Sequence, residues 1–438
     1  MLETVKLAKG EELKAIVHPI VTNVNAANFR VSVFQHASLF KMKNLMVLAA
    51  GPLQLPVVET ARRMGLRVVV LDGDPKAPGL KLADRAHVVN ITDPGVCLAL
   101  ARKECVDGVI HICSEVSMLV LGRINDALGL AGPGYATALA ATNKQKMREA
   151  FAAGGAPSPQ SFGAATEAEA LAAAARLGGS IIVKPSRNSG SRGVTRIGDS
   201  ADQEQLLAAF RRAMKESRDH SAVIEEFVEG PEFSVEILVW NGEPRVLTVT
   251  DKETSEAPFF VETGHSQPTQ YSEAERGQIV AAAVKGVRAL GIDWSAAHAE
   301  VRLTSSGPRL MEIGSRLGGD FITTELVPRS TGIDMVEGAI RLALGEEPNL
   351  VQRHPPQGAA IRYLIPKPGR VVDVEGVAEA RRMDGVRIVE VAVAPGGSVP
   401  EMNSSLARVG HVIAEGASAP EAVARAEAAR EAIRITTG

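Results

Sequence analysis

The chain has 438 residues, which is too long for a single hydrophobic core and predicts two to four domains. Hydrophobic residues make up 45% of it and charged residues 23%, the proportions of an ordinary globular protein. The formal net charge of -3 gives no sign of a nucleic-acid or membrane partner, and no apolar run has transmembrane length. Three cysteines, eight residues apart, lack metal-ligand spacing and indicate buried thiols in a reducing cytoplasm.

The first part of the chain predicts an α/β domain preceded by an extension. Residues 1–41 do not share the pattern of the residues after them, and an N-terminal extension, an extra strand pair and a misassigned start all fit them. From residue 44 to about 133, short apolar runs alternate with helical patterns, which predicts a parallel sheet covered by helices. The first turn lacks GxGxxG, and its Pro52 has no amide for a pyrophosphate, so we expect no dinucleotide site there. Ser114 and Glu115 follow a predicted strand end, where ligands collect in open sheets; a helix N-cap is the alternative for Ser114.

Two lysines lie where an anion could bind. Lys144 opens a predicted helix, where its charge opposes the helix dipole; this indicates an anionic partner, with a solvated surface lysine as the alternative. Lys184 ends a β-branched strand, and a loop of small residues leads from there to Val194. Small residues let backbone N–H groups approach a phosphate closely, although composition alone also fits a flexible hairpin loop. The loop residues are Ser186, Asn188, Ser189, Gly190, Ser191 and Gly193.

Two further segments carry charged residues whose purpose stays open from the residues alone. Residues 223–235 predict a strand, a turn and a second strand, and most of their glutamates would be surface charges on this pattern alone. Residues 259–271 predict a polar loop in which Glu262 and His265 stand out, though a lone loop histidine is usually only solvated.

The stretch 298–319 is the most informative one. Polar and apolar residues alternate on both sides of a turn at 305–308, which predicts an antiparallel hairpin with Glu300 opposite Glu312. Opposed residues hold their Cβ atoms about 4.5–5.5 Å apart, and two carboxylates that close need a proton or a cation. Oxygen ligands favour Mg²⁺ that carries nucleotide phosphates, and Arg316 suits a phosphoryl or carboxylate oxygen. The alternative is a solvated hairpin face with two unrelated glutamates.

The C-terminal quarter predicts a small α+β lid that packs on the core. A helix over 333–344 ends at a glycine. Strands follow over 359–365 and 386–393, and an alanine-rich helix from residue 420 to about 433 closes the chain.

The order of these motifs resembles that of the ATP-grasp superfamily of carboxylate–amine ligases, over roughly residues 42 to 438. A lysine, a Lys-Pro strand end with a glycine loop, the run EEFVEGPE at 225–232, and paired glutamates before an arginine follow one another. Within the superfamily, the chain resembles the L-amino acid ligases of the bacilysin-synthetase type. The runs ETGHSQP at 262–268, GSRLGG at 314–319 and RVGHV at 408–412 carry this second resemblance.

This resemblance implies a multidomain chain of α/β and α+β class with the ATP-grasp fold. Its expected parts are an N-terminal extension (1–41), a Rossmann-like pre-ATP-grasp domain (42–133), an ATP-grasp domain (134–345) with a lid subdomain at about 158–228, and a C-terminal α+β lid domain (346–438).

The resemblance also implies a nucleotide site. Lys144 and Lys184 correspond to lysines that contact the ATP phosphates, and Lys184 also lies near the adenine. Glu232 corresponds to the acid that binds the ribose hydroxyls. The mobile loop over the triphosphate corresponds to residues Ser186, Ser189, Gly190, Ser191 and Gly193. The hinge strand at the adenine edge corresponds to Glu225, Glu226, Phe227 and Val228.

For the chemical steps, the resemblance makes Glu300 and Glu312 the Mg²⁺ ligands. Arg316, with Lys184, steadies the transferring phosphoryl group. Glu262 and His265 line the amino-acid pocket.

One departure from the superfamily follows Glu312. Many members read E-[IL]-N-P-R, in which the asparagine is a further metal ligand. This chain has Gly314 in place of that asparagine and Ser315 in place of the proline. Either one metal is held differently, or Ser315 or a water substitutes.

The expected activity is that of an ATP-dependent carbon–nitrogen ligase. It would join an amino acid to an amine through an acyl-phosphate, give ADP and phosphate, and form dipeptides. The alternatives are a purine-pathway ribotide enzyme, a biotin-type carboxylase, or an ATP-binding module without chemistry. ATP and Mg²⁺, or Mn²⁺ in its place, are the implied cofactors, and small-molecule carboxylates and amines are the partners. The resemblance leaves a homodimer open.

Overall fold

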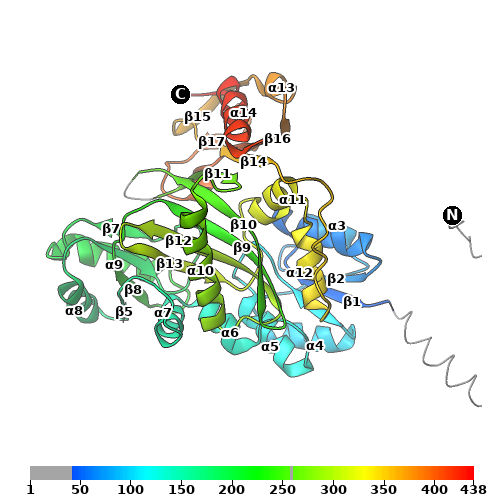
Figure 1. The fold of residues 1–438 in the computed structure, drawn as a ribbon, viewed down its shortest axis with the longest axis horizontal. Coiled ribbons are helices and arrows are strands. Elements are labelled where there is room, and N and C mark those ends of the chain that lie inside the picture. Colours follow the sequence, from blue (N-terminus) through cyan, green and yellow to red (C-terminus); the bar gives the residue numbers. More distant parts are fainter. Residues whose placement is uncertain (1–41, 257–259) are drawn as a thin grey trace, which may run out of the picture. The chain divides into compact units, whose positions relative to one another are not determined.

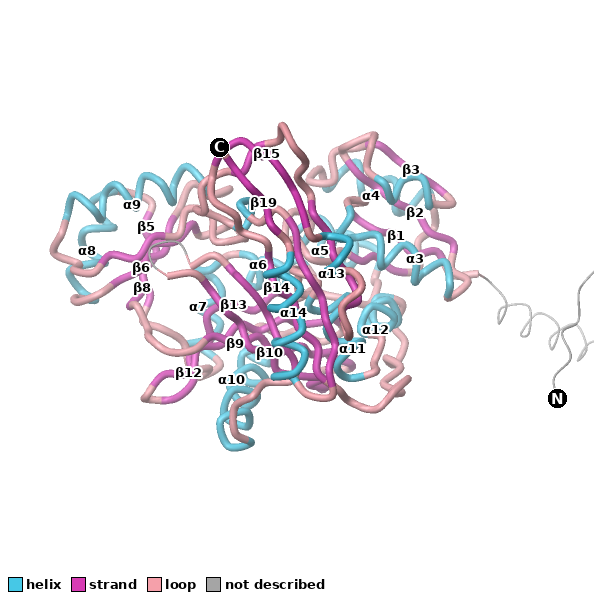
Figure 2. Tube along the Cα trace, turned by 90° about the horizontal axis from the view of Figure 1, so that it is seen from above, coloured by secondary structure: helices cyan, strands magenta, loops and turns pink. Residues whose placement is uncertain are grey.

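The computed structural model describes residues 42–256 and 260–438, and the expected N-terminal extension lies outside the described residues. Asn44–Gly438 form one compact unit. In it, a parallel sheet and a small antiparallel sheet lie at opposite ends of a large antiparallel sheet (Figure 1, Figure 2). None of the described helices combines the length and the apolar character that a membrane crossing requires.

The N-terminal part is the predicted parallel sheet. Its strands are β1 (Asn44–Leu48), β2 (Arg67–Asp72), β3 (Arg85–Val88) and β4 (Gly108–Ile110). They lie in the order β3-β2-β1-β4, and every neighbouring pair is parallel. The helices around it are α3 (Leu55–Arg63), α4 (Pro94–Lys103), α5 (Met118–Leu128) and α12 (Met335–Ala343). Because α3 and α12 pack on one face and α4 and α5 on the other, every residue of β1 is buried.

The small antiparallel sheet falls within the expected lid subdomain. Its strands are β5 (Ser161–Ala164), β6 (Ile181–Pro185), β7 (Thr195–Ile197) and β8 (Ala222–Glu226), in the order β5-β8-β6-β7. Two helices, α8 (Glu167–Leu177) and α9 (Gln203–Glu216), bury its apolar face. The segment of small residues that connects β6 to β7, residues 186–194, is called the glycine loop.

The large sheet has eight antiparallel strands in the order β13-β12-β9-β10-β11-β14-β18-β16. These are β9 (Glu232–Trp240), β10 (Glu243–Thr254), β11 (Glu262–Gln267), β12 (Ser295–Thr304), β13 (Gly307–Gly314), β14 (Gly358–Tyr363), β16 (Val386–Val391) and β18 (Gly410–Gly416). Helices α7 (Lys144–Ala153) and α10 (Glu273–Ala289) bury the apolar residues of β9, β12 and β13, such as Val235, Ala299 and Ile313. Strand alternation therefore puts Ser234, Glu300 and their neighbours on the opposite, polar face.

The predicted hairpin is confirmed. β12 and β13 pair antiparallel around a turn at 305–306, and Glu300 stands in register with Glu312.

The segment 259–271 was predicted as a polar loop, and its residues 262–267 are instead strand β11. β11 is hydrogen-bonded to β10 on one side and to β14 on the other, so its backbone is satisfied although its sequence is polar. His265, Ser266 and Gln267 are buried in it. The prediction was wrong because the side chains of β11 line a cavity and are polar. The alternation of polar and apolar residues that predicts a strand is therefore absent from this segment.

The C-terminal segment contributes three strands to the large sheet, since β14, β18 and β16 extend it beyond residue 345. Helix α14 (Ala419–Ala432) packs on these strands. The prediction that this helix is the last element was wrong. Strand β19 (Arg434–Thr437) follows it and pairs with β15 (Gly369–Glu375). We propose the limits 42–133, 134–345 and 346–438 for the domains.

The remaining elements are short connections. They are α6 (Tyr135–Thr142), α11 (Val327–Thr331), α13 (Val377–Ala380), β17 (Ser398–Val399), the 3-10 helices Pro52–Gln54, Pro78–Leu82 and Ser405–Ala407, and the π-helix Ile322–Leu326.

Candidate active site

A cavity of about 480 Å³ lies between the glycine loop and the polar face of the large sheet. Of the site residues predicted from the sequence, those that line it are Lys144, Lys184, Ser189, Gly190, Ser191, Glu225, Glu226, Phe227, Val228, Glu232, Glu262, His265, Glu300, Glu312 and Arg316. Ser186 and Gly193 do not line it and shape the loop instead. The Ser186 hydroxyl donates to Asp219, and Gly193 has a φ of +74° where a Cβ would lie 2.9 Å from Pro185.

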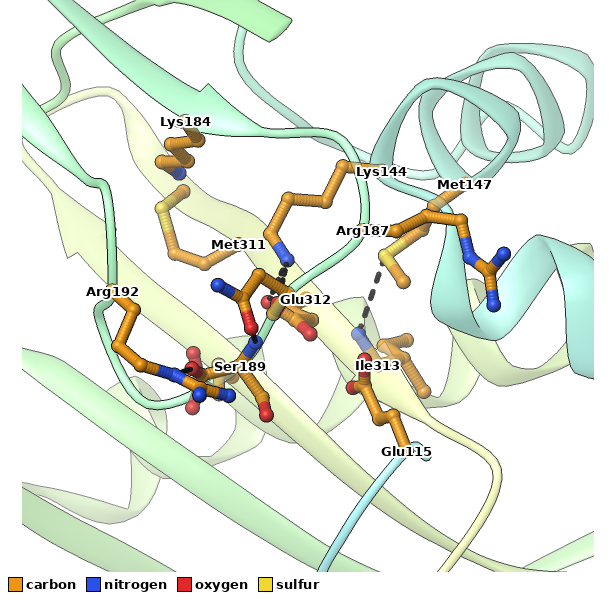
Figure 3. Close-up of polar contacts among 12 residues, drawn as sticks. Glu115, Lys144, Met147, Lys184, Arg187, Ser189, Arg192, Met311, Glu312 and Ile313 are labelled. Carbon is orange, nitrogen blue, oxygen red and sulfur yellow. Dashed lines mark hydrogen bonds and ion pairs between the residues drawn. The ribbon is translucent and has the colours of Figure 1, made fainter. Parts of the chain in front are cut away.

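Lys144 faces an acid inside the cavity, which rules out the solvated-lysine alternative. It is the first residue of α7, after the N-cap Asn143, and is only 7% exposed. Its ammonium lies 3.0 Å from a Glu312 oxygen and donates to the carbonyl of Asn188 in the glycine loop (Figure 3). Burial would lower the pKa of Lys144, but Glu312 and Glu115 raise it above its ordinary value. Lys144 is therefore a cation at neutral pH.

Glu225 is fully buried at the end of β8 and lies between two cations. Its carboxylate is 2.7 Å from Arg148 Nε and 2.8 Å from Lys184 Nζ. Burial would raise the pKa of Glu225, but the charges of Arg148 and Lys184 outweigh it and lower the pKa to about 2. A contact of this side chain with an adenine would have to break an ion pair, so Glu226 and the hinge backbone are the better candidates for that role.

Glu300 and Glu312, together called the acid pair, both face the cavity. Each carboxylate has its own lysine: Lys144 pairs with Glu312, and Lys252 Nζ lies 3.2 Å from Glu300. Burial would raise the pKa of both acids, but these lysines, with His298 beside Glu300, lower it below its ordinary value. Two lysines of the protein thus supply the positive charge that the pair requires.

The donor set of the acid pair fits Mg²⁺ nevertheless. Two carboxylates facing a lysine-lined cavity match the way Mg²⁺ is usually held, by one or two carboxylates together with substrate phosphates. In residues 42–256 and 260–438, no three His, Cys, Asp or Glu side chains assemble a metal site of their own. The arrangement therefore suits a metal that arrives with a nucleotide.

Ser315 does not take the place of the missing asparagine ligand. Gly314 lines the main cavity, whereas Ser315 points to the other side of the strand and lines a second, smaller cavity. Two of the possibilities named above remain: a water replaces the asparagine ligand, or one metal is held differently.

Lys252 is a site residue that the sequence did not reveal. Its side chain, on β10, is 8% exposed and lies between Glu232 at 2.6 Å, Glu300 at 3.2 Å and Glu262 at 3.6 Å. Burial would lower the pKa of Lys252, and these carboxylates raise it well above its ordinary value. In the sequence, Lys252 stands on the polar side of an alternating strand, a pattern that surface lysines share.

Glu115, which the sequence placed at a strand end where ligands collect, reaches the site through a contact with Arg316 that the sequence did not predict. It follows the carboxyl end of β4, is 4% exposed, and lies 3.4 Å from Arg316 Nη2. Burial, together with the nearby Glu312, raises the pKa of Glu115 to about 8. Ser114 does not cap a helix, because its hydroxyl accepts from Val116 and α5 begins only at Met118.

A group of polar residues from β11 and the C-terminal segment completes the cavity. Both Arg408 nitrogens Nη1 and Nη2 donate to Asp320, at 2.8 and 2.7 Å. His265 is 1% exposed, and its Nε2 lies 3.6 Å from Asp320 Oδ2. Burial would raise the pKa of Asp320, but His265 and Arg408 lower it strongly. Glu262 Oε2 is buried and accepts no hydrogen bond from the described part of the chain.

Comparisons with known families agree with this geometry. Residues 177–325 match the model of the ATP-grasp domain, and residues 362–438 match that of the L-amino acid ligase C-terminal domain 2. The crystal structure of an L-amino acid ligase from Bacillus licheniformis superposes with a TM-score of 0.78 at 24% identity, over 90% of this chain and 99% of that one, which establishes the fold.

Two curated relatives have described activities. The L-arginine-specific L-amino acid ligase of Bacillus subtilis is 26% identical over 330 residues, 74% of this chain and 79% of its own length. The formate-dependent phosphoribosylglycinamide formyltransferase of Burkholderia thailandensis is 28% identical over 411 residues, 89% of this chain and 95% of its own length.

The chain therefore contains an ATP-grasp domain, and the ligases that share this domain use ATP and Mg²⁺ to form carbon–nitrogen bonds. The chain carries the C-terminal domain of the L-amino acid ligases, which confirms the resemblance seen in the sequence.

Proposed function

We propose that the protein joins an amino acid, or a related carboxylate, to an amine through an acyl-phosphate, and that the product is a dipeptide. The observation that carries this proposal is the content of the main cavity. Its cations and acid pair suit a triphosphate, and Glu262, His265 and Asp320 offer a second polar group beside them. The L-amino acid ligase C-terminal domain and the relative from Bacillus subtilis support the choice of amino acids as substrates.

In the first step, an oxygen of the substrate carboxylate attacks the γ-phosphorus of ATP, and the bond from that phosphorus to the bridging oxygen of ADP breaks. Lys144, Lys184 and Arg316 bring positive charge to the phosphate oxygens. Lys252, which lies beside the acid pair, is a fourth cation that can do the same. Positioning and charge neutralisation are what such a step needs from a protein. A Mg²⁺ held by the acid pair would neutralise further phosphate charge.

In the second step, the amine nitrogen attacks the acyl carbon, and the bond from that carbon to the phosphate oxygen breaks. Glu262 can accept the proton that the amine loses, because its buried Oε2 is free of hydrogen bonds within the described structure. The glycine loop, which lines the cavity, must keep water out during this step, because an exposed acyl-phosphate would hydrolyse.

The test is ADP release by the full chain with ATP and Mg²⁺, with and without pairs of amino acids, and mass spectrometry of the products. We expect ADP release that depends on the pair and a product mass equal to the two amino acids less one water. Glu312→Gln should abolish turnover, and Glu204→Gln, at an exposed position of α9, should leave it unchanged. Activity of Glu312→Gln would refute the metal assignment, and nucleotide binding without substrate-dependent ADP release would favour a non-catalytic module.

The relative from Burkholderia thailandensis favours a second candidate, formate-dependent formyl transfer to phosphoribosylglycinamide. The same assay with formate and that ribotide separates the two. Turnover with the ribotide and none with amino acids would replace the dipeptide proposal.

A further inference from the structure

Arg316 has an incomplete set of contacts, and a small second cavity lies beside it. Its Nη1 donates to the carbonyl of Leu317, and its Nη2 reaches Glu115. Its Nε–H is buried and donates to no atom of the described residues. A cavity of about 30 Å³ is lined by Arg316, by His111 from the end of the N-terminal sheet and by Ser315 from the end of β13.

His111 and Ser315, which line this small cavity, each have one unpaired polar side-chain atom. Both side chains are 2% exposed, and neither His111 Nε2 nor Ser315 Oγ has a hydrogen-bond partner among the described residues. His111 Nδ1 lies 2.7 Å from the carbonyl of Leu48, which can only accept, so Nδ1 carries the proton and Nε2 is an acceptor. Burial, with the charge of Arg316 nearby, lowers the pKa of His111 to about 4, so the ring is neutral at neutral pH.

We infer that the small cavity is a binding site for one ordered water molecule, which links His111 and Ser315 to Arg316 and fixes the direction of its guanidinium. A water needs roughly 10–15 Å³ and two to four polar partners, and this cavity offers enough of both. The water accepts a hydrogen bond from Arg316 Nε–H. It donates one hydrogen bond to His111 Nε2 and the other to Ser315 Oγ. The walls are otherwise largely apolar, with Ile110 and Leu121 among them, so these three groups determine how the water sits.

His111 and Ser315 are then positioning residues that act through a shared water. Their effect on turnover rests on the proposed function, in which the Arg316 guanidinium contacts the phosphoryl group; the water site itself does not. The inference also gives a use to Ser315, because the proline at this position in the E-[IL]-N-P-R pattern has no hydroxyl. The water would also connect the N-terminal sheet, which supplies His111, with Arg316 in the main cavity.

A crystal structure of the nucleotide-free full chain, at a resolution that shows ordered water, tests the site directly. We expect one density peak at hydrogen-bonding distance, about 2.7–3.2 Å, from Arg316 Nε, His111 Nε2 and Ser315 Oγ. A dry cavity, or an Arg316 Nε that donates to a protein atom instead, overturns the inference. This readout does not depend on any activity.

Kinetics test the positioning effect. Ser315→Ala removes one partner of the water, and His111→Asn removes another while keeping a donor for Leu48. Each should lower kcat about 2- to 10-fold, as expected for one hydrogen bond, and leave the KM for ATP unchanged. The double variant should be little worse than either single one, because both act through the same water. Ser117→Ala, an equally buried serine away from this cavity, is the matched control.

Fully multiplicative effects in the double variant, or variants that behave like Ser117→Ala, would overturn the role of the water. If the wild type shows no substrate-dependent ADP release, the proposed function fails while the crystallographic test still decides the water site.

Discussion

Replacing Glu225 with glutamine should cost about 3 kcal/mol of stability at pH 7. The carboxylate is fully buried between Arg148 and Lys184, and their charges lower its pKa from the ordinary 4.5 to about 2. Each tenfold change in acid constant corresponds to about 1.4 kcal/mol, so this shift is worth about 3 kcal/mol to the folded state. Breaking a buried ion pair by removing one partner costs roughly 3–5 kcal/mol in other proteins, which agrees with this magnitude.

The pH dependence of this contribution has the same physical cause. Because the folded-state pKa of Glu225 is depressed, its contribution is fully present above pH 4.5 and disappears as the pH falls toward about 2. The difference in unfolding free energy between wild type and Glu225→Gln should therefore shrink between pH 5 and pH 3. Urea denaturation followed by far-UV circular dichroism measures it at each pH.

Glu226→Gln is the matched control for this experiment. Glu226 is the next residue, is partly exposed, and accepts a hydrogen bond from the Gln160 amide without entering the ion pairs of Glu225. We expect a loss below about 1 kcal/mol for it. Equal losses for the two variants at pH 7, or a Glu225→Gln difference that stays constant down to pH 3, would refute the reasoning.

Three further predictions concern the other buried charges. Lys252→Met removes the cation that Glu232, Glu262 and Glu300 share and should lower both the unfolding free energy, by about 3–5 kcal/mol, and the rate of ADP release, by about 10²–10³-fold; a variant unchanged in both would contradict the assigned contacts. Burial would lower the pKa of His298, but Glu236 raises it to about 9. The unfolding free energy of the wild type should therefore fall as the pH rises from 6.5 through 9. Urea titrations of His298→Gln should not show this fall. Asp320→Asn removes the bidentate partner of Arg408 and should raise the KM for an amino-acid substrate while calorimetry shows unchanged ADP affinity; weaker ADP binding would place this pair in the nucleotide site instead.

Local patterns were enough to predict the central part of the site. The alternation around residues 305–306 determines which side chains share a face, and a tight turn determines the register, so Glu300 could be placed opposite Glu312 from the sequence. The glycine loop was found in the same way, because small residues that directly follow a strand and a lysine favour close approach of the backbone to an anion. Arg316 follows the second strand directly and so shares its end of the cavity.

What could not be predicted is which distant residues these side chains meet. Lys252 is placed beside Glu300 by strand order, β12-β9-β10, and no spacing in the sequence encodes that order. Glu115 reaches Arg316 from another sheet, 201 residues away along the chain. Strand β11 was missed for a related reason, because a central strand that lines a cavity need not alternate between polar and apolar residues.

These long-range contacts change the physical account of the acid pair. Two opposed glutamates need a proton or a cation, and Lys144 and Lys252 already supply positive charge in the protein alone. The same two lysines face the cavity in which a triphosphate would lie, so an arriving phosphate competes with the carboxylates for them. Any lysine drawn toward phosphate leaves a carboxylate in need of a new cation, which is what a nucleotide-borne Mg²⁺ provides. The buried charges that stabilise the nucleotide-free fold are thus the groups that the substrate rearranges, and metal affinity should be created by nucleotide binding and not precede it.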